Sequence, residues 1–121
     1  KNAGIKLVFV NGIPTADKNI VQQLARRLQT WNSVDLRVDR KALEASNTRA
    51  TIAFGRHPEV ATLNPMELLC DEAKCEVERN GKAITVDGGH LSQSGAFILS
   101  PLFNSTLADI KANQQSLVTM E

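Results

Sequence analysis

An aspartate and a histidine in the last third of the chain have the residue types for proton-transfer chemistry. Asp87 and His90 are separated by Gly88 and Gly89, and two glycines permit a tight turn that aims both side chains one way. A carboxylate that holds an imidazole prepares it to act as a general base. The Asp-x-x-His spacing is a weak signal by itself, because so short a gap is common by chance. A histidine that only fixes its own loop is the alternative interpretation.

Cys70 and Cys75 are the only cysteines in the sequence. An even pair that closes a short, charged loop indicates a disulfide in an oxidising compartment. Two free thiols in a cytosolic protein are an equally open alternative on composition alone. A zinc site is less favoured, because His57 lies upstream and His90 stands alone downstream, so no second Cys/His pair completes four ligands.

The size and charge of the chain limit what it can be. Its 121 residues, 42% hydrophobic and 22% charged, are enough for one core and too few for two ordinary domains. With a net charge of +1 and 4% aromatic residues, nothing predicts a nucleic-acid surface. No apolar run approaches the roughly 20 residues that cross a bilayer. Because the chain begins at Lys1 without an initiator methionine, we expect a processed form or a fragment of a longer protein.

The elements that must position these residues begin with a strand and a helix. Residues 5–10 are nearly continuously apolar, which predicts a strand buried on both faces. Asp17 is the expected cap of a helix whose apolar side ends in a core Trp31, with Arg26 and Arg27 on the solvated face.

A second helix is predicted from residue 40 to about residue 54, where Gly55 ends it. Residues 60–63 form a short strand, and residues 66–69 one helical turn before the cysteines. Residues 5–10 and 60–63 are the candidate parallel strands of an α/β domain. Because the sequence predicts so few strands, residues 5–10 lack neighbouring strands in the sheet. We therefore expect the domain to be incomplete.

A hairpin and a final helix flank the Asp-x-x-His pair. Residues 76–78 and 83–86 surround the turn dipeptide Asn80-Gly81, which predicts a hairpin that leads into Asp87. We expect this turn to bring the pair together at the mouth of a cleft.

Ser92 is the expected cap of the last helix, in which Pro101 should introduce a bend and residues beyond Ile110 should fray. The apolar face of this helix is formed by Gly95, Ile98, Leu99, Leu102 and Phe103.

The segment from Asp87 to Ala96 reads Asp-Gly-Gly-His-Leu-Ser-Gln-Ser-Gly-Ala. It resembles the end of SGNH (GDSL-like) hydrolase domains, and in particular the SGNH domain fused to membrane acyltransferases of the type-3 family, which O-acetylate cell-surface sugars. The last block of that domain reads Asp-x-x-His-Leu-Ser-x-x-Gly-Ala. Cys70 and Cys75, followed by a hairpin, match the short disulfide loop common in the family. The resemblance covers most of the chain, with specific residues only from Cys70 to about Leu102.

The resemblance implies that residues 1–121 are the C-terminal portion of one SGNH domain. It implies a partial SGNH or flavodoxin-like three-layer α/β/α fold with a short parallel sheet, a β-hairpin and a C-terminal helix. Asp87 and His90 are then the catalytic acid and base of Ser-His-Asp acyl transfer, without a cofactor or a metal, and Cys70 and Cys75 form a disulfide. The implied partners are an N-terminal SGNH half, a membrane acyltransferase domain, an acyl donor and a carbohydrate acceptor. The implied location is the periplasm, with a tether to the inner membrane through the parent protein.

The family's Gly-Asp-Ser block and its oxyanion-hole Gly and Asn normally precede this region and have no counterpart here, since Asn2 and Asn11 lack the expected context. Ser92 is committed to capping, Ser94 should point along the helix, and Ser100 lacks the sharp exposed turn of a nucleophile. We therefore expect the serine to lie outside this chain, and the chain alone to show little or no ester hydrolysis.

Other functions remain open. Water as the second acceptor makes the complete domain an esterase, whereas a sugar hydroxyl makes it a transferase. The principal alternative is a non-catalytic periplasmic binding or interaction module with an SGNH-like ending. Such a module associates with a partner, or with a second copy of itself, through its exposed strand edge. A small cytosolic α/β regulatory domain with free thiols is a third hypothesis.

Overall fold

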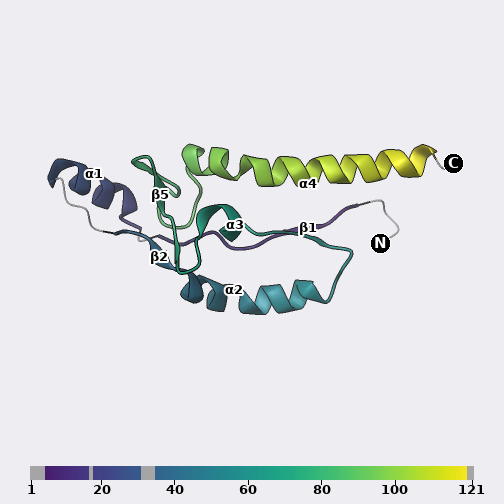
Figure 1. Cartoon of the computed structure of the whole chain (residues 1–121), viewed down its shortest axis with the longest axis horizontal. Helices are drawn as coiled ribbons and strands as arrows, with labels where there is room; N and C mark the ends of the chain where they lie inside the picture. Colours follow the sequence, from purple (N-terminus) through teal and green to yellow (C-terminus); the bar gives the residue numbers. More distant parts are fainter. Residues whose placement is uncertain (1–4, 17, 31–34, 120–121) are drawn as a thin grey trace.

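The computed structural model describes residues 5–16, 18–30 and 35–119. The order of elements is β1 (Val8–Val10), α1 (Ile20–Thr30), β2 (Val38–Asp39), α2 (Arg40–Gly55), β3 (Ala61–Leu63), α3 (Met66–Leu69), β4 (Lys74–Cys75), β5 (Glu78–Arg79), β6 (Lys82–Ala83) and α4 (Gln93–Thr119). In Figure 1, β1 runs between α2 on one side and the long α4 on the other. This mixed α/β arrangement confirms the predicted fold class.

The parallel pair of strands is confirmed, but its expected burial on both faces is wrong. β1 pairs with β3 in parallel, with Phe9 opposite Thr62. The Phe9 ring stacks on Phe54 of α2, with centroids 4.1 Å apart. Val8 and Val10, which alternate with Phe9, are 36% and 40% exposed. The reason is that β1 has one strand neighbour among the described residues, so part of its apolar surface has nothing to pack against.

The described core consists of small clusters where loops and helix ends converge. The first joins α1 to the segment after β4, the second joins α2 to the disulfide, and the third joins α3 to the hairpin and α4. Their buried members are Ile20, Leu24 and Val77; Leu43, Met66 and Cys75; and Leu69, Ile84 and Leu99. Each cluster therefore ties an early element to the segment that leads to Asp87.

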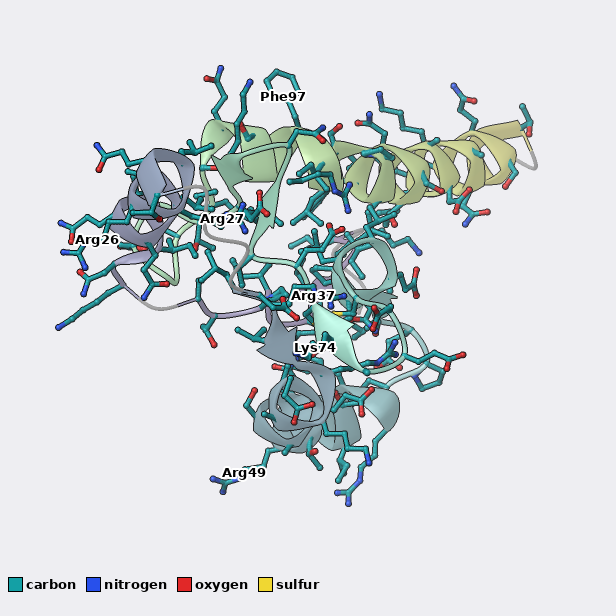
Figure 2. All side chains as sticks on the ribbon, turned by 60° about the vertical axis from the view of Figure 1, so that its left-hand side comes forward. Arg26, Arg27, Arg37, Arg49, Lys74 and Phe97 are labelled. Atoms are coloured by element: carbon teal, nitrogen blue, oxygen red, sulfur yellow. A yellow bond between two sulfur atoms is a disulfide. The ribbon has the colours of Figure 1, made fainter. Side chains whose placement is uncertain are left out.

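Helix α1 is confirmed in position and only partly in packing. Leu24 is buried, whereas Leu28 on the predicted apolar face is 65% exposed. The predicted cap Asp17 and the predicted core residue Trp31 lie outside the described residues. Arg26 projects away from the body of the molecule (Figure 2). Arg27 is not simply solvated, because its guanidinium contacts the Glu78 carboxylate at 2.7 Å and so links α1 to the hairpin.

Helix α2 is confirmed, although it extends through Gly55 instead of ending before it, and the backbone N–H of Arg56 donates to the Phe54 carbonyl. The single helical turn at Met66–Leu69 is also confirmed. Among the described residues, no helix combines the length and the apolar character that crossing a bilayer requires.

The disulfide is confirmed: Cys70 and Cys75 are bonded, which excludes the free-thiol alternative for this structure. The hairpin is confirmed as well, with strands shorter than predicted. Asn80 and Gly81 both have positive φ values, 54° and 76°, as a two-residue type I′ turn requires.

The cap of α4 is confirmed and its predicted fraying is wrong. The backbone N–H of Gly95 donates to Ser92 Oγ at 3.0 Å, and the helix continues to Thr119. Pro101 lies inside the helix without ending it; the bend stays a prediction. Proline leaves the carbonyl four residues earlier without its helical donor, and the Ser100 hydroxyl donates to that Phe97 carbonyl at 2.8 Å. Beyond Ile110 the described side chains are exposed, and good helix formers such as lysine, alanine and glutamine favour continuation of the helix.

Two helical glycines give a matched test of the packing of α4. A Cβ on Gly95 would lie 2.2 Å from the Ile84 carbonyl oxygen, whereas a Cβ on Gly55 would meet nothing within 4 Å. We expect Gly95→Ala to lower the free energy of unfolding by about 1–3 kcal/mol. Gly55→Ala should leave it unchanged or raise it by up to about 1 kcal/mol. Urea denaturation measures both, and equal stabilities of the two variants would contradict the close packing.

Reduction gives a second test, because a disulfide restricts the unfolded chain. For so short a loop we expect a reductant to lower the free energy of unfolding by about 2 kcal/mol. The measurement is urea denaturation with and without reductant, and Cys70→Ala/Cys75→Ala is the control that should not respond. Two reactive thiols in the untreated protein would show that the bond is absent.

Candidate active site

A short turn between β6 and α4 carries the two residues predicted to be catalytic. The backbone N–H of Val86 donates to the His90 carbonyl at 2.8 Å, which closes the turn. Gly88 within this turn is buried and has a φ of 86°, a backbone conformation that is unfavourable for residues other than glycine. Its carbonyl accepts the backbone N–H of Ala16 at 3.1 Å, so the loop between β1 and α1 holds the turn from outside.

The turn brings Asp87 and His90 together, as their spacing predicts. The Nδ1 atom of His90 lies 2.7 Å from Asp87 Oδ2. The other carboxylate oxygen, Oδ1, accepts the backbone N–H of His90 at 2.8 Å and that of Gly89 at 3.1 Å. Both oxygens are therefore engaged, and the carboxylate holds the ring and the backbone of the same histidine.

These hydrogen bonds set the protonation state of the pair. The backbone N–H of His90, then the His90 ring and the backbone N–H of Gly89, lower the pKa of Asp87 from 3.8 to about 2. At neutral pH the carboxylate is ionised and can only accept hydrogen bonds, so Nδ1 of His90 carries the donated proton. In the neutral ring the lone pair is then on Nε2, the atom that acts as base in an Asp-His-Ser arrangement.

The described residues leave the pair exposed, so they do not enclose it in the expected cleft. The side chains of His90 and Asp87 are 84% and 51% exposed. A cavity of about 420 Å³ between α1, the hairpin and the start of α4 is lined by the adjoining Val86 and Ser94, but not by the pair itself. The turn thus presents the pair on an open surface, because the described residues place no further segment over it.

The serines near the pair take part in helix hydrogen bonds or line a cavity. Ser92 Oγ donates to the Ala83 carbonyl at 2.6 Å and accepts the Gly95 N–H, and Ser100 is bonded to Phe97 within the helix. Ser94 lines the neighbouring cavity, and its predicted orientation along the helix stays a prediction. Among the described serines, none is hydrogen-bonded to the imidazole of His90.

His57 lies just after α2, is 59% exposed, and contacts Glu59 through Nδ1 at 3.3 Å, as expected of a surface residue. Within the described ranges, no three His, Cys, Asp or Glu side chains gather in a way that could hold a metal ion.

Two further features of the structure were not predicted from the sequence. One is an ion-pair cluster beside the disulfide, where Asp35 accepts from both Arg37 and Lys74 at 3.0 Å; Figure 2 shows these two cations close together. The Arg37 guanidinium, then its backbone N–H and Lys74, lower the pKa of Asp35 well below its usual range. Arg37 lies two residues from Asp35 and pairs with it locally, whereas Lys74 lies far along the chain, so no sequence signal predicts that Lys74 joins this cluster.

The second missed feature is a cavity whose lining includes Asn11 and Asn64. A signal for it was available, because each asparagine directly follows a strand of the predicted parallel pair, and the carboxyl ends of such strands form ligand sites.

Comparison with known proteins gives one finding. The family model described as the SGNH domain fused to AT3 (type-3 acyltransferase) domains matches residues 1–105. This range includes the disulfide and the turn from Asp87 to His90. Neither a curated protein nor a solved structure matches the chain significantly.

The hydrogen bonds of Asp87 predict its titration. Its carboxyl carbon, followed by NMR, should titrate with a pKa of about 2. Because the folded pKa is below the unfolded value, Asp87 stabilises the fold at neutral pH, and this stabilisation is lost as the pH falls from about 4 to about 2. In His90→Ala the pKa should rise but stay below 3.8, since the backbone N–H groups remain. A native value near 3.8 would contradict the geometry.

Proposed function

We propose that this chain, which belongs to the family of SGNH domains fused to AT3 domains, supplies the general base and its orienting acid for acyl transfer to cell-surface sugars. The observation that carries the proposal is the 2.7 Å contact between His90 Nδ1 and the ionised Asp87 carboxylate. It leaves Nε2 of His90 as the basic atom of the neutral ring. The carboxylate fixes the tautomer and stabilises the imidazolium that forms after proton uptake.

In this mechanism Nε2 of His90 removes the proton of a serine hydroxyl as the serine oxygen attacks an acyl carbonyl. The imidazolium then returns the proton to the leaving group, and an acyl-serine ester remains. In the second half the same nitrogen deprotonates the acceptor as the acceptor attacks the ester, and the imidazolium then returns this proton to the departing serine oxygen, which regenerates the serine hydroxyl and the neutral ring. A sugar hydroxyl as acceptor gives O-acetylation, and water gives hydrolysis; we assign transfer of an acetyl group because the family is one fused to AT3 domains.

We assign the serine and the oxyanion donors to an N-terminal SGNH half outside this sequence. Two observations support a complementing segment. The imidazole of His90 is 84% exposed, whereas a working base is enclosed with its substrate. Val8 and Val10 are also exposed on a strand with one described neighbour, which suits a sheet that continues on its free side.

We place the complete protein outside the cytoplasm, held at the inner membrane by its AT3 domain. The Cys70–Cys75 disulfide supports this location, because such bonds persist in oxidising compartments. The family, whose SGNH domains are fused to AT3 domains, supports the membrane partner domain in the parent protein.

A second candidate function is a non-catalytic binding or interaction module. The open position of Asp87 and His90 favours it, together with the commitment of the described Ser92 and Ser100 to helix hydrogen bonds. The two functions differ in whether the parent protein carries a Gly-Asp-Ser block: a parent without that block would favour the binding module.

The test is hydrolysis of p-nitrophenyl acetate by the longest polypeptide that contains this chain. We expect His90→Ala to lower kcat/KM by roughly 10²–10⁴-fold, since a general base contributes that much. Asp87→Asn should also lower it, by loss of the correct tautomer. His57→Ala, which alters an exposed histidine outside the pair, is the matched control and should retain the full rate.

The 121 residues alone should show little or no hydrolysis. Equal rates in the unaltered and His90→Ala polypeptides would remove His90 from the reaction and leave the binding module as the better description.

A further inference from the structure

Basic residues are unevenly distributed along the chain. Ten of the 14 Lys and Arg residues lie in residues 1–56, together with four of the 13 Asp and Glu residues. This half therefore has a net charge of +6, and residues 57–121 have a net charge of −5. Helix α2 belongs to the basic half and lies on one side of the molecule, with β1 between it and α4 (Figure 1).

The inward face of α2 is apolar and fixes the orientation of the helix. Leu43 is buried in the cluster beside the disulfide, and the ring of Phe54 stacks on Phe9 with centroids 4.1 Å apart. Because eleven residues make about three full turns of an α-helix, Leu43 and Phe54 lie on the same face. The opposite face of α2 is therefore the one that the molecule presents to its surroundings.

This outer face, which we call the basic face of α2, consists of Lys41, Ala45, Arg49, Ile52 and Arg56. Successive members are three or four residues apart, which is the spacing of one helix face. All five side chains are exposed. Arg49 projects away from the body of the molecule (Figure 2). Arg56 directly follows the helix in a helical backbone conformation and so continues the row.

The cations of the basic face have no close counter-charge in the described part of the chain. Its ion pairs do not include Lys41, Arg49 or Arg56. Glu44, the acidic residue of α2, pairs with Arg40 at 2.8 Å. The basic face thus combines three positive charges on one exposed surface and has no carboxylate of its own.

An apolar side chain lies among these cations. Ile52 is 54% exposed and lies one helical turn from both Arg49 and Arg56. On an anionic membrane surface, such an aliphatic side chain enters the headgroup region while the neighbouring cations pair with phosphates. An acidic polypeptide would also pair with the cations, but its polar side chains would give Ile52 no apolar contact. The combination therefore favours lipid over an acidic protein segment.

We propose that the basic face of α2 binds anionic phospholipid headgroups of the membrane that holds the parent protein. The proposal rests on the membrane location proposed for that protein, whose family has SGNH domains fused to AT3 domains. It does not rest on catalysis by His90. Three cations bind weakly by themselves, since each strengthens binding to an anionic surface only about fivefold. A tether to a membrane domain raises the effective concentration of the face, so this weak contact is enough to orient the domain.

The test is binding of the chain to phosphatidylcholine vesicles with and without phosphatidylglycerol, at low ionic strength. We expect binding to the anionic vesicles only, and its loss at high salt, because salt screens exposed charges. Arg49→Gln should weaken binding about fivefold, and the triple variant Lys41→Gln/Arg49→Gln/Arg56→Gln about a hundredfold. Lys111→Gln removes an exposed cation of α4 with the same change in net charge, and this matched control should bind as tightly as the unaltered chain.

A second measurement reports which side of the molecule meets the membrane. A lipid whose headgroup chelates a paramagnetic ion broadens the methyl NMR signals of side chains that lie near it. We expect the Ile52 methyl signals to broaden. Leu107 of α4 has the same exposure, 54%, and its methyl signals should stay sharp. Equal broadening at Leu107 would overturn the proposal.

Two other outcomes would also overturn it. One is binding that is unchanged in the triple variant or equally strong on vesicles without phosphatidylglycerol. The other is a chain that ignores the vesicles but binds polyglutamate and loses this binding in Arg49→Gln, which would assign the basic face to an acidic protein partner. His90→Ala should leave vesicle binding unchanged, so that this surface and the proposed acyl-transfer site stand or fall separately.

Discussion

The close approach of α4 to the segment after the hairpin is the constraint on which the candidate active site depends. Gly95 packs against the Ile84 backbone, where any Cβ would collide with a carbonyl oxygen. Ser92 makes two hydrogen bonds at the same junction: its backbone N–H donates to the Ile84 carbonyl, and its hydroxyl donates to the Ala83 carbonyl. The residues between these fixed points must form a tight turn, and Asp87 and His90 lie within it.

The rest of the fold supports this junction. Ile84 and Leu99 are buried with Leu69 in one cluster, and the disulfide joins the end of α3 to the strand that precedes the hairpin. The carbonyl of Gly88 accepts a hydrogen bond from the backbone N–H of Ala16, in the loop that follows β1. The turn is therefore held from three directions, although its two polar side chains remain exposed. Such a hydrogen-bonded but exposed arrangement suits a pair that works only when another segment completes the site.

The predictions that succeeded depend on short stretches of sequence. Asn80-Gly81 supplies the positive φ angles of a two-residue turn, and Ser92 supplies an oxygen within reach of the Gly95 N–H. The parallel strands also succeeded, because two apolar runs separated by helices have few alternative pairings. The predictions that failed depend on distant neighbours. Whether residues 5–10 are buried, and whether the pair lies in a cleft, is set by what packs beside them.

The sequence by itself determined the chemical identity of the pair, the spacing that lets one turn join them, and the cysteines that close the neighbouring loop. Only the tertiary structure decided that the side chains of Asp87 and His90 are exposed, that Arg27 pairs with Glu78, and that Asn11 and Asn47 line one cavity. The reason is physical. Turns and caps are formed by hydrogen bonds between residues a few positions apart, whereas the Arg27–Glu78 ion pair, the burial of side chains and the cavities are made by segments that only folding brings together.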